Sequence, residues 1–362
     1  MNNLTDKFDK YINDCLKNPL SQFHHLSGSG ATYEFEQKLK KYYSKKHAVT
    51  FSNCTTAMLT LCHSLNLKNK EVITTPLNWG GSISPIIFSG SKIIFSSIDQ
   101  KSLNLNPSDL VNSLSSKTKA VLSVDYNGIP SDSKQIKEFC KSNNLYYISD
   151  SAQSFGAFRD QRPAGYFADF IVLSFGPGKS LFGGEGGVIL TDNEEIYEKI
   201  IWFSQHPYRQ KSTFGPDTYN EYLPFNGRLN PFSAIMLNNL FNVFLKRIKT
   251  KQIKTFDLLN LLSKNKFVHL PDQISQFNNS AYFKLQYLLS KNLNIKIIND
   301  FLKINNFKFQ ATQYKPNLIP LDKMFIRQFK NKYHSNKSYL KNLLHLDYIS
   351  LNEITNDNIL ID

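Results

Sequence analysis

Two side chains with the chemistry of a catalytic pair follow apolar segments of this chain. Lys179 lies in the sequence Ser-Phe-Gly-Pro-Gly-Lys-Ser, which follows the apolar run at 170–173 and precedes a glycine-rich turn. Asp150 opens the sequence Asp-Ser-Ala-Gln, which follows the strand-like run at 146–148. Because glycine lets the backbone bend sharply, we expect Lys179 on a tight loop at the end of a buried strand.

An amine and a carboxylate at the ends of two buried strands suit one cofactor well. Pyridoxal 5'-phosphate (PLP) needs an amine with which to form a Schiff base and a carboxylate that keeps its ring nitrogen protonated. The sequence therefore predicts PLP as the cofactor, with Lys179 and Asp150 as catalytic residues that also contact it.

A junction between a strand and a helix offers a place for the phosphate of the cofactor. Asn53, Cys54 and Thr55 lie between the predicted strand 47–51 and a helix that runs to about Leu65. A helix N-terminus presents free backbone N–H groups and the positive end of the helix dipole, which suit a phosphate. Ordinary helix capping by polar side chains is the alternative interpretation.

Further candidate residues come after other predicted strands. Trp79 follows the strand at 72–75, where its ring could stack on a flat cofactor or pack as an ordinary core or surface residue. Asn127, Gln153 and Ser174 also come just after strands. Since α/β sheets gather ligands outside the carboxyl ends of their strands, we expect these side chains to share one site.

The motifs Ser-Phe-x-Pro-x-Lys at 174–179 and Asp-Ser-Ala-Gln at 150–153 resemble those of the DegT/DnrJ/EryC1/StrS family. These proteins are PLP-dependent sugar aminotransferases of fold type I. The resemblance is good from about Gly28 to Ala234 and looser from there to the C-terminus. It implies transfer of an amino group from an amino acid, usually glutamate, to a nucleotide-linked keto sugar in surface polysaccharide or sugar biosynthesis.

The resemblance also implies roles for individual residues. Gln153 would bond the ring hydroxyl, and Ser174 would join Asn53, Cys54 and Thr55 in holding the phosphate. Cys54 stands where the family usually has glycine, which leaves the backbone N–H donors in place, and we do not expect a nucleophile there.

The segment 225–234 resembles the Asn-x-Arg motif of the family, with Asn226 and Arg228 at the matching positions. In the family this asparagine reaches the cofactor phosphate of the neighbouring subunit, which implies a homodimer with shared active sites. A plain loop before a helix is the alternative interpretation. Arg228, Asn127 and Glu185 are weaker candidates for contacts to the substrate, and Glu185 could equally face solvent in its turn.

Other functions remain open at this point. The same chemistry would suit an aminotransferase for a small phosphorylated ketone. A PLP-dependent sugar dehydratase is disfavoured, because such family members typically carry histidine where this chain has Lys179. A non-catalytic PLP-binding regulator is disfavoured by the intact Lys179, Asp150 and Gln153. The sequence shows no spacing typical of a metal site, so we expect no metal.

Alternating strands and helices predict an α/β protein with a mostly parallel sheet. The resemblance to the family implies that the fold is aspartate-aminotransferase-like. We expect a large domain over 1–240 with a mostly parallel, seven-stranded sheet, and a small α+β domain over 241–362. Substrate contacts are expected from loops at 205–222 and 310–318.

Composition sets broader limits. The 362 residues carry a net charge of +14, which reflects either solvated lysine-rich surfaces or a field that attracts phosphorylated substrates. No nucleic-acid motif, signal peptide or membrane-length apolar run is visible, so neither nucleic acid nor membrane is an expected partner. The chain has no Cys-x-x-Cys pair, which favours a reduced, cytoplasmic location; the four cysteines are Cys15, Cys54, Cys62 and Cys140.

Overall fold

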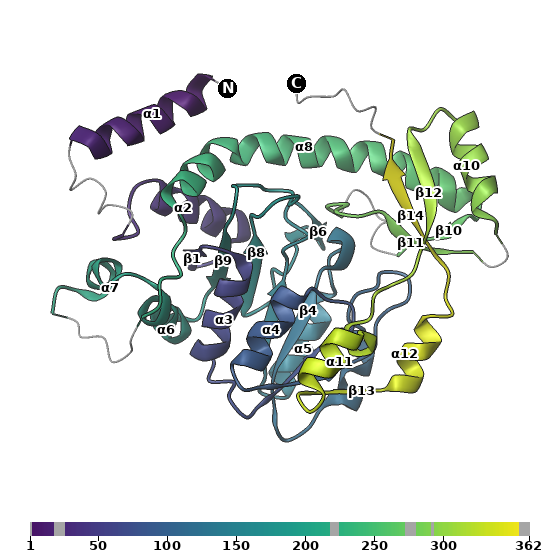
Figure 1. Ribbon diagram of the computed structural model, residues 1–362, viewed down its shortest axis with the longest axis horizontal. Coiled ribbons are helices and arrows are strands. Elements are labelled where there is room, and N and C mark those ends of the chain that lie inside the picture. The colour runs from purple at the N-terminus through teal and green to yellow at the C-terminus, as the bar shows by residue number, and fades with distance from the viewer. Residues whose placement is uncertain (1, 18–25, 218–223, 272–279, 291–292, 355–362) are drawn as a thin grey trace.

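A computed structural model describes residues 2–17, 26–217, 224–271, 280–290 and 293–354 (Figure 1). A large sheet forms its centre, with strand order β1-β9-β8-β5-β4-β2-β3-β13. Only β9 runs against the direction of the others. The strands are β1 (His47–Phe51), β2 (Glu71–Thr74), β3 (Lys92–Phe95), β4 (Thr118–Val124), β5 (Tyr146–Asp150), β8 (Phe170–Ser174), β9 (Gly187–Thr191) and β13 (Tyr333–Ser335).

The sheet has eight strands, one more than the sequence predicted. The additional strand is β13, which returns from the C-terminal part of the chain and pairs in parallel with β3 at the edge of the sheet. Tyr333 packs there against Phe95 and Phe325. The pairing of β13 depends on contacts with residues such as Phe95 that are distant in the sequence. The short polar segment around Tyr333 does not indicate a strand by itself.

Helices cover both faces of the large sheet, because side chains alternate between its faces. On β5, Tyr147 joins the core on one face and Ile148 joins the core on the other. The first face is covered by α2 (Ala31–Tyr43), α5 (Ser133–Ser142) and α8 (Pro231–Lys264). The second face is covered by α3 (Cys54–Ser64), α4 (Gly80–Phe88), α6 (Glu194–Ser204) and α11 (Lys323–Phe329).

A second sheet, antiparallel with order β10-β11-β14-β12, lies toward the C-terminus. Its strands are β10 (Val268–His269), β11 (Gln286–Leu289), β12 (Phe309–Tyr314) and β14 (Tyr348–Glu353), and α10 (Ile295–Ile304) packs on it. The remaining elements are α1 (Asn2–Lys17), α7 (Pro207–Phe214), α12 (Lys337–Leu343), the 3-10 turns Pro107–Ser113, Tyr126–Gly128 and Ile319–Leu321, and the small ribbon β6 (Phe158–Arg159) and β7 (Arg162–Pro163).

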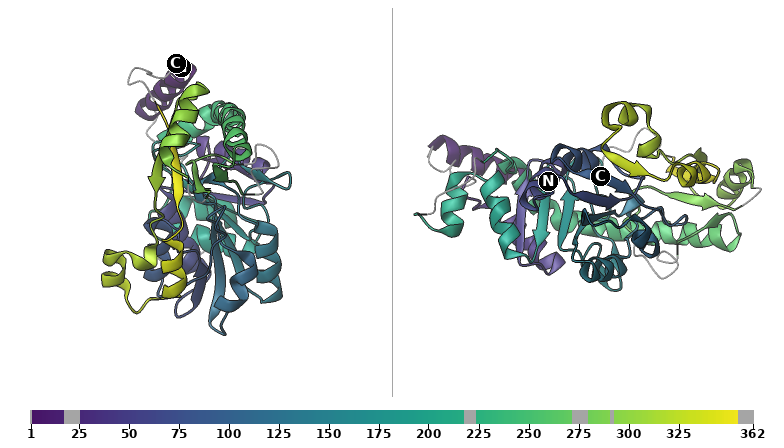
Figure 2. Two further views of the ribbon diagram at one scale, coloured as in Figure 1. Left: turned by 90° about the vertical axis from the view of Figure 1, so that its right-hand side faces the viewer. Right: turned by 90° about the horizontal axis from the view of Figure 1, so that it is seen from below.

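The long helix α8 belongs to both parts of the protein (Figures 1 and 2). Near its start, Leu237 and Phe241 pack in a core of the large sheet. Near its end, Leu258 and Leu262 pack in the core of the small sheet. The predicted division at 240–241 falls inside this helix, and we propose two domains that share α8.

The two predicted substrate loops contain regular structure. Residues 207–214 form α7, which Pro207 opens at a position that favours proline. Residues 309–314 form β12, which pairs with β14. The prediction of an open loop was therefore wrong for these parts. Residues 218–223 of the first loop lie outside the described residues.

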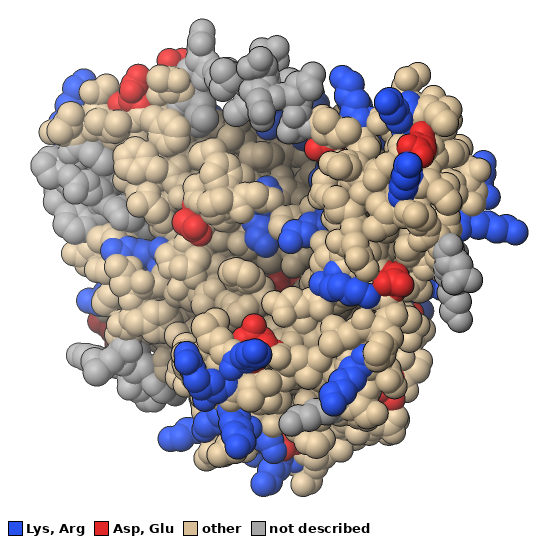
Figure 3. Space-filling view, turned by 45° about the vertical axis from the view of Figure 1, so that its right-hand side comes forward, with Lys and Arg blue, Asp and Glu red and all other residues tan. Residues whose placement is uncertain are grey.

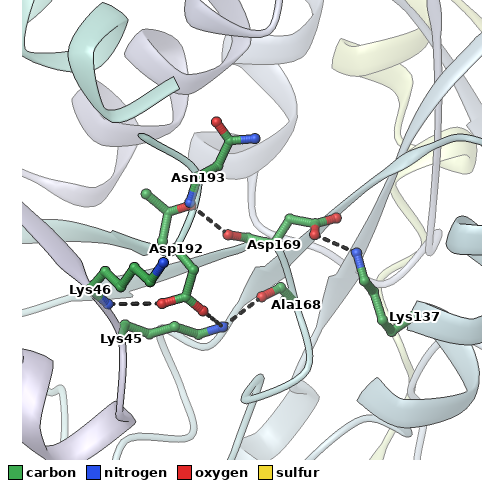
Figure 4. Close-up of polar contacts among 8 residues, drawn as sticks. Lys45, Lys46, Lys137, Ala168, Asp169, Asp192 and Asn193 are labelled. Carbon is green, nitrogen blue, oxygen red and sulfur yellow. Dashed lines mark hydrogen bonds and ion pairs between the residues drawn. The ribbon is translucent and has the colours of Figure 1, made fainter. Parts of the chain in front are cut away.

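Polar contacts stabilise the large sheet at the amino ends of its parallel strands, opposite their carboxyl ends (Figure 4). Asp192 accepts hydrogen bonds from the Lys45 Nζ at 3.1 Å and from the Lys46 backbone N–H at 2.8 Å. Asp169 forms an ion pair with Lys137. The first two contacts join the start of β1 to the end of β9, and the ion pair joins the start of β8 to α5.

The described helices include none whose length and apolar character would let it cross a bilayer.

Candidate active site

The carboxyl ends of the parallel strands bring most of the predicted residues to one edge of the sheet. Because β1, β4, β5 and β8 run in the same direction, the residues that follow them meet there. β9 runs in the opposite direction, so its first residue, Gly187, begins at this edge. Residues placed at this edge directly after strand ends include Asn53, Cys54, Asn127, Gln153 and Lys179.

Asp150 ends β5 and is almost fully buried. Its carboxylate accepts hydrogen bonds from the Ser82 Oγ at 2.5 Å and from the Ala152 backbone N–H at 3.1 Å. Burial raises the pKa of this carboxyl, while Ser82, Ala152 and the charge of Lys179 lower it. A buried carboxylate of this kind is stabilised further by a cationic partner.

Lys179 lies on the tight loop that the sequence predicted. Its backbone N–H donates to the Gly176 carbonyl at 3.2 Å, and Gly178 has a φ of 76°, which favours glycine. Its Nζ lies 4.7 Å from the centre of the Phe283 ring. The charge of Lys179 lowers the pKa of Asp150, so the predicted catalytic pair lies in one electrostatic environment.

Cys54 lies within reach of the same two charges. Burial raises the pKa of its thiol, Asp150 raises it further, and Lys179 lowers it. The thiol therefore keeps its proton, which agrees with the expectation that Cys54 is not a nucleophile.

The N-terminus of α3 opens onto this edge. The Asn53 side chain caps the helix by accepting from the Thr56 backbone N–H at 2.8 Å. A Cβ on Gly187 would lie 2.6 Å from the Cys54 nitrogen, so only glycine lets β9 start against this helix. The first N–H groups of a helix have no partner within the helix and suit an anion.

The neighbouring helix α4 begins beside α3. A Cβ on Gly81 would lie 2.6 Å from the Thr55 Oγ1 and 2.9 Å from a carbon of the Trp79 ring. Trp79 itself is 76% exposed in the isolated chain. Its indole is thus available at the edge of the site, and its stacking on a cofactor stays a prediction.

Asn127 has an unusual backbone conformation and a buried side-chain amide without a hydrogen-bond partner in the described chain. Its φ is 58°, an uncommon conformation for a residue other than glycine. Its backbone N–H donates to the Gln153 Oε1 at 2.9 Å, and its carbonyl accepts from the Phe283 N–H at 3.0 Å. Both polar atoms of its side-chain amide are buried without a partner in the described chain. Such atoms cost free energy unless a ligand or water bonds them.

Asn226 and Arg228 lie beside the end of β1. The Ser52 backbone N–H donates to the Gly227 carbonyl at 2.7 Å, and Arg228 donates to the Asn226 Oδ1 at 2.5 Å. Together with Glu185 they line a cleft of about 380 Å³. The structure describes one chain, so a role of Asn226 toward a neighbouring subunit stays a prediction.

Ser174 ends β8, and its Oγ accepts from the Gly176 N–H at 3.5 Å. A Cβ on Gly176 would lie 3.2 Å from the Glu185 Oε2. Glu185 therefore faces the loop that carries Lys179.

Three residues of the site were missed from the sequence. Ser82 bonds Asp150, and Phe283 contacts Lys179 from the C-terminal part of the chain. Asp125 is fully buried directly after β4 and accepts from the Ser151 and Ser154 hydroxyls at 2.8 and 2.6 Å. Of these three residues, only Asp125 could have been identified from the sequence, because it directly follows a predicted strand, as Asp150 does.

The comparisons with known proteins agree with this architecture. Residues 5–358 match the DegT/DnrJ/EryC1/StrS aminotransferase family. The chain belongs to this family. A GDP-perosamine synthase of Escherichia coli O157:H7 is 32% identical over 202 residues, which are 55% of this chain and 54% of that protein. A UDP-4-amino-4,6-dideoxy-N-acetyl-beta-L-altrosamine transaminase of Helicobacter pylori is 30% identical over 228 residues, 62% of this chain and 60% of that one.

Solved structures show the same fold. A GDP-4-keto-6-deoxy-D-mannose-3-dehydratase of E coli with bound hydrated PLP aligns with a TM-score of 0.73 and 19% identity over 90% of this chain and 88% of that one. The chain therefore has the predicted fold of type I. The alignments to the two relatives above span a little more than half of their length.

Proposed function

We propose that this protein is a PLP-dependent aminotransferase that moves an amino group from glutamate to a nucleotide-linked keto sugar. The observation that carries the proposal is the pair of Lys179 and Asp150 at the carboxyl edge of the sheet, where the charge of the lysine acts on the buried carboxylate. Family membership supports the reaction class.

The residues present fit the cofactor. Asp150 is a buried carboxylate that a cationic ring nitrogen would stabilise. The Asn127 side-chain amide is buried without a partner among the described residues, and a polar group of the cofactor could bond it. Gln153 lies next to Asn127 and could bond the ring hydroxyl. The α3 N-terminus with Asn53, and Ser174 nearby, would hold the phosphate. When bound, PLP supplies an aldehyde that takes up amines and a ring that accepts electrons.

Each protein group then has a defined task. Lys179 would hold the cofactor through its amine and, when that amine is free, could move a proton to and from the donor carbon. Asp150 holds a proton at the ring nitrogen. Ser82 orients Asp150 and favours its charged form. Trp79, whose side chain is 76% exposed, would cover the ring of the bound cofactor.

The acceptor is proposed from the relatives. The two named above act on or produce amino sugars linked to GDP and UDP, as their names state. Glu185 and Arg228, which share the cleft beside Ser52, are proposed contacts to the substrate. The dehydratase with the same fold shows that architecture alone does not select the reaction. Lys179 favours amino transfer.

We further propose a homodimer with shared sites, in which Asn226 reaches the cofactor phosphate of the neighbouring subunit. The exposure of Asn226, Trp79 and Phe232 at this edge supports an additional covering surface. A reduced, cytoplasmic location is proposed because the described cysteines, Cys54, Cys62 and Cys140, are all free thiols.

A Lys179→Ala variant tests the proposal. We expect it to take up PLP but to form no amino sugar from glutamate with UDP- and GDP-linked keto sugars. Lys249→Ala, which removes a lysine from the exposed surface of α8, is the matched control and should retain activity. Unchanged turnover in Lys179→Ala would refute the role given to this lysine.

A further inference from the structure

Asp125 is a buried acidic residue to which the proposed reaction assigns no task. It directly follows β4 and is fully buried. On the face of the molecule shown in Figure 3, several acidic side chains lie beside basic ones. Asp125 differs, because no cationic side chain lies within ion-pair distance of its carboxylate in the described part of the chain. A buried charge without such a partner is costly, so its hydrogen bonds have to offset that cost.

Three donors surround the carboxylate of Asp125. Its Oδ1 accepts from the Ser131 backbone N–H at 2.7 Å. Its Oδ2 accepts from the hydroxyls of Ser151 and Ser154 at 2.8 and 2.6 Å. Burial raises the pKa of this carboxyl, while hydrogen bonds from Ser154, Ser131 and Ser151 lower it. The donors therefore favour the charged form, in which both oxygens accept.

Two of these donors lie in the loop that follows β5. Ser151 and Ser154 stand on either side of Gln153 in the sequence, and Ser151 directly follows Asp150. The Ser154 backbone N–H donates to the Ser151 carbonyl at 3.1 Å, which closes a tight turn. One carboxylate oxygen of Asp125 therefore holds both ends of the short segment that carries Gln153.

The backbone of Asp125 adds further contacts. Its N–H donates to the Asp150 carbonyl at 3.1 Å, and its carbonyl accepts from the Gly128 N–H at 3.1 Å, which closes a second turn. Within this second turn, the Asn127 N–H donates to the Gln153 Oε1 at 2.9 Å. Asp125 thus fixes the loop that carries Gln153 relative to the turn that binds its side chain.

Close packing restrains the same segments. A Cβ on Gly128, whose φ is 82°, would lie 2.8 Å from the Gln153 carbonyl oxygen and 2.9 Å from the Phe283 nitrogen. The Phe283 ring in turn contacts Lys179. A shift of the turn that begins at Asp125 would therefore displace groups that surround the predicted cofactor.

The side chain of Asp125 is not a second partner for the ring nitrogen of the cofactor. Burial raises the pKa of Tyr147, and the charge of Asp125 raises it further. Tyr147 belongs to the core on the face of the large sheet that α2, α5 and α8 cover. Asp150 bonds Ser82 of α4, which covers the opposite face. Asp125 therefore acts through the loop it holds rather than by contact with the ring.

We propose that Asp125 is a positioning residue, which holds the loop 151–154 so that Gln153 meets the ring hydroxyl of PLP while Asp150 meets the ring nitrogen. The inference rests on the role proposed for Gln153. Because Asp125 acts through Gln153, changes at the two residues should not have independent effects on PLP binding.

Titration of the purified protein, freed of cofactor, with PLP tests the inference, with the visible absorbance of bound PLP as the signal. Asp125→Ala removes the acceptor of both serine hydroxyls and should weaken PLP binding about tenfold or more. Gln153→Ala should also weaken PLP binding, and the double variant should bind PLP within about twofold of the weaker-binding single variant. Asp125→Asn should bind PLP more tightly than Asp125→Ala, because its amide can donate to both serine oxygens.

Asp169→Asn is the matched control. It makes the same change of charge and weakens the ion pair with Lys137 at the amino ends of the strands, away from the site. It should bind PLP as the unchanged protein does, even where its urea midpoint falls. This control separates a general loss of stability from displacement of the loop.

A second measurement needs neither cofactor nor reaction. Hydrogen exchange of the Asn127 amide should be faster in Asp125→Ala than in the unchanged protein, because its acceptor on Gln153 is no longer held in place. The variant with both Ser151→Ala and Ser154→Ala keeps the carboxylate and should show the same faster exchange. It decides the question if Asp125→Ala does not fold. Asp169→Asn should leave this exchange unchanged.

Losses of PLP affinity that multiply in the double variant would overturn the inference, since Asp125 would then act independently of Gln153. So would equal PLP affinities of Asp125→Asn and Asp125→Ala, or unchanged exchange of the Asn127 amide in the serine variant. Normal PLP binding by Gln153→Ala would remove the role proposed for Gln153 itself. Exchange of the Asn127 amide reports on Asp125 separately, so the two failures are distinguishable.

Discussion

The ion pair between Arg209 and Glu36 gives a prediction whose size follows from the structure. Both side chains are buried, at 6% and 4% exposed. Glu36 accepts hydrogen bonds from the Arg209 guanidinium at 2.8 and 3.1 Å, and from the Thr50 N–H and hydroxyl, both at 2.8 Å. The pair joins α2 and α7 to β1, the strand that leads into the α3 N-terminus.

Arg209→Ala leaves the Glu36 carboxylate buried with the two Thr50 donors alone. Removing one partner of a buried ion pair costs about 3–5 kcal/mol. We expect the lower end, about 3 kcal/mol, because those two donors still stabilise the carboxylate. Adding Glu36→Gln to Arg209→Ala removes the unpaired charge and should restore part of the loss.

The assay is the urea midpoint and slope of unfolding, followed by circular dichroism, for both single variants and the double variant. Lys199→Ala is the control: it breaks the exposed pair with Glu195 on α6 and should leave the midpoint unchanged. An Arg209→Ala loss below about 1 kcal/mol, or a double variant no more stable than Arg209→Ala, would refute the reasoning.

Three further predictions concern the site. Ser82→Ala removes a hydrogen bond that lowers the pKa of Asp150, so PLP binding should be lost at a higher pH in the variant when the pH is decreased. The measurement is PLP absorbance as a function of pH. The same pH of loss in both proteins would show that Ser82 does not act on Asp150. The raised pKa of Asp150 means that the folded, cofactor-free protein binds this proton more tightly than the unfolded chain, so its contribution to stability falls as pH rises above the ordinary value of 3.8. Asp150→Asn should remove that fall in urea midpoints while weakening PLP binding, and an identical pH dependence in both proteins would contradict this. Gly187→Ala should weaken PLP binding by about tenfold or more, since its Cβ would collide with the α3 N-terminus, whereas Gly80→Ala meets no atom within 4 Å and should bind PLP normally.

The sequence predicted much of this site because the signal is local. Lys179, Asp150 and Asn53 each follow an apolar run, and parallel strands end at one edge. Knowledge of the strand ends was therefore enough to group them. The hydrogen bonds between Asn127 and Gln153, and between Ser82 and Asp150, join segments whose register only the folded sheet defines.

Other features depended on contacts that the sequence does not display. The strand containing Tyr333 is three residues long, and its place beside β3 is set by packing on Phe95 and Phe325. The polar residues of α7 predict a loop, because they do not indicate that Arg209 is buried, although Pro207 is a typical helix-start signal. The contact of Phe283 with Lys179 joins two parts of the chain more than a hundred residues apart.

The most direct test of the central claim is a visible absorption spectrum of the purified protein before and after addition of glutamate. The account predicts a yellow protein, coloured by PLP joined to Lys179, that loses this colour as glutamate donates its amino group. Lys179→Ala should lack that change. A colourless protein that takes up no added PLP would contradict the account.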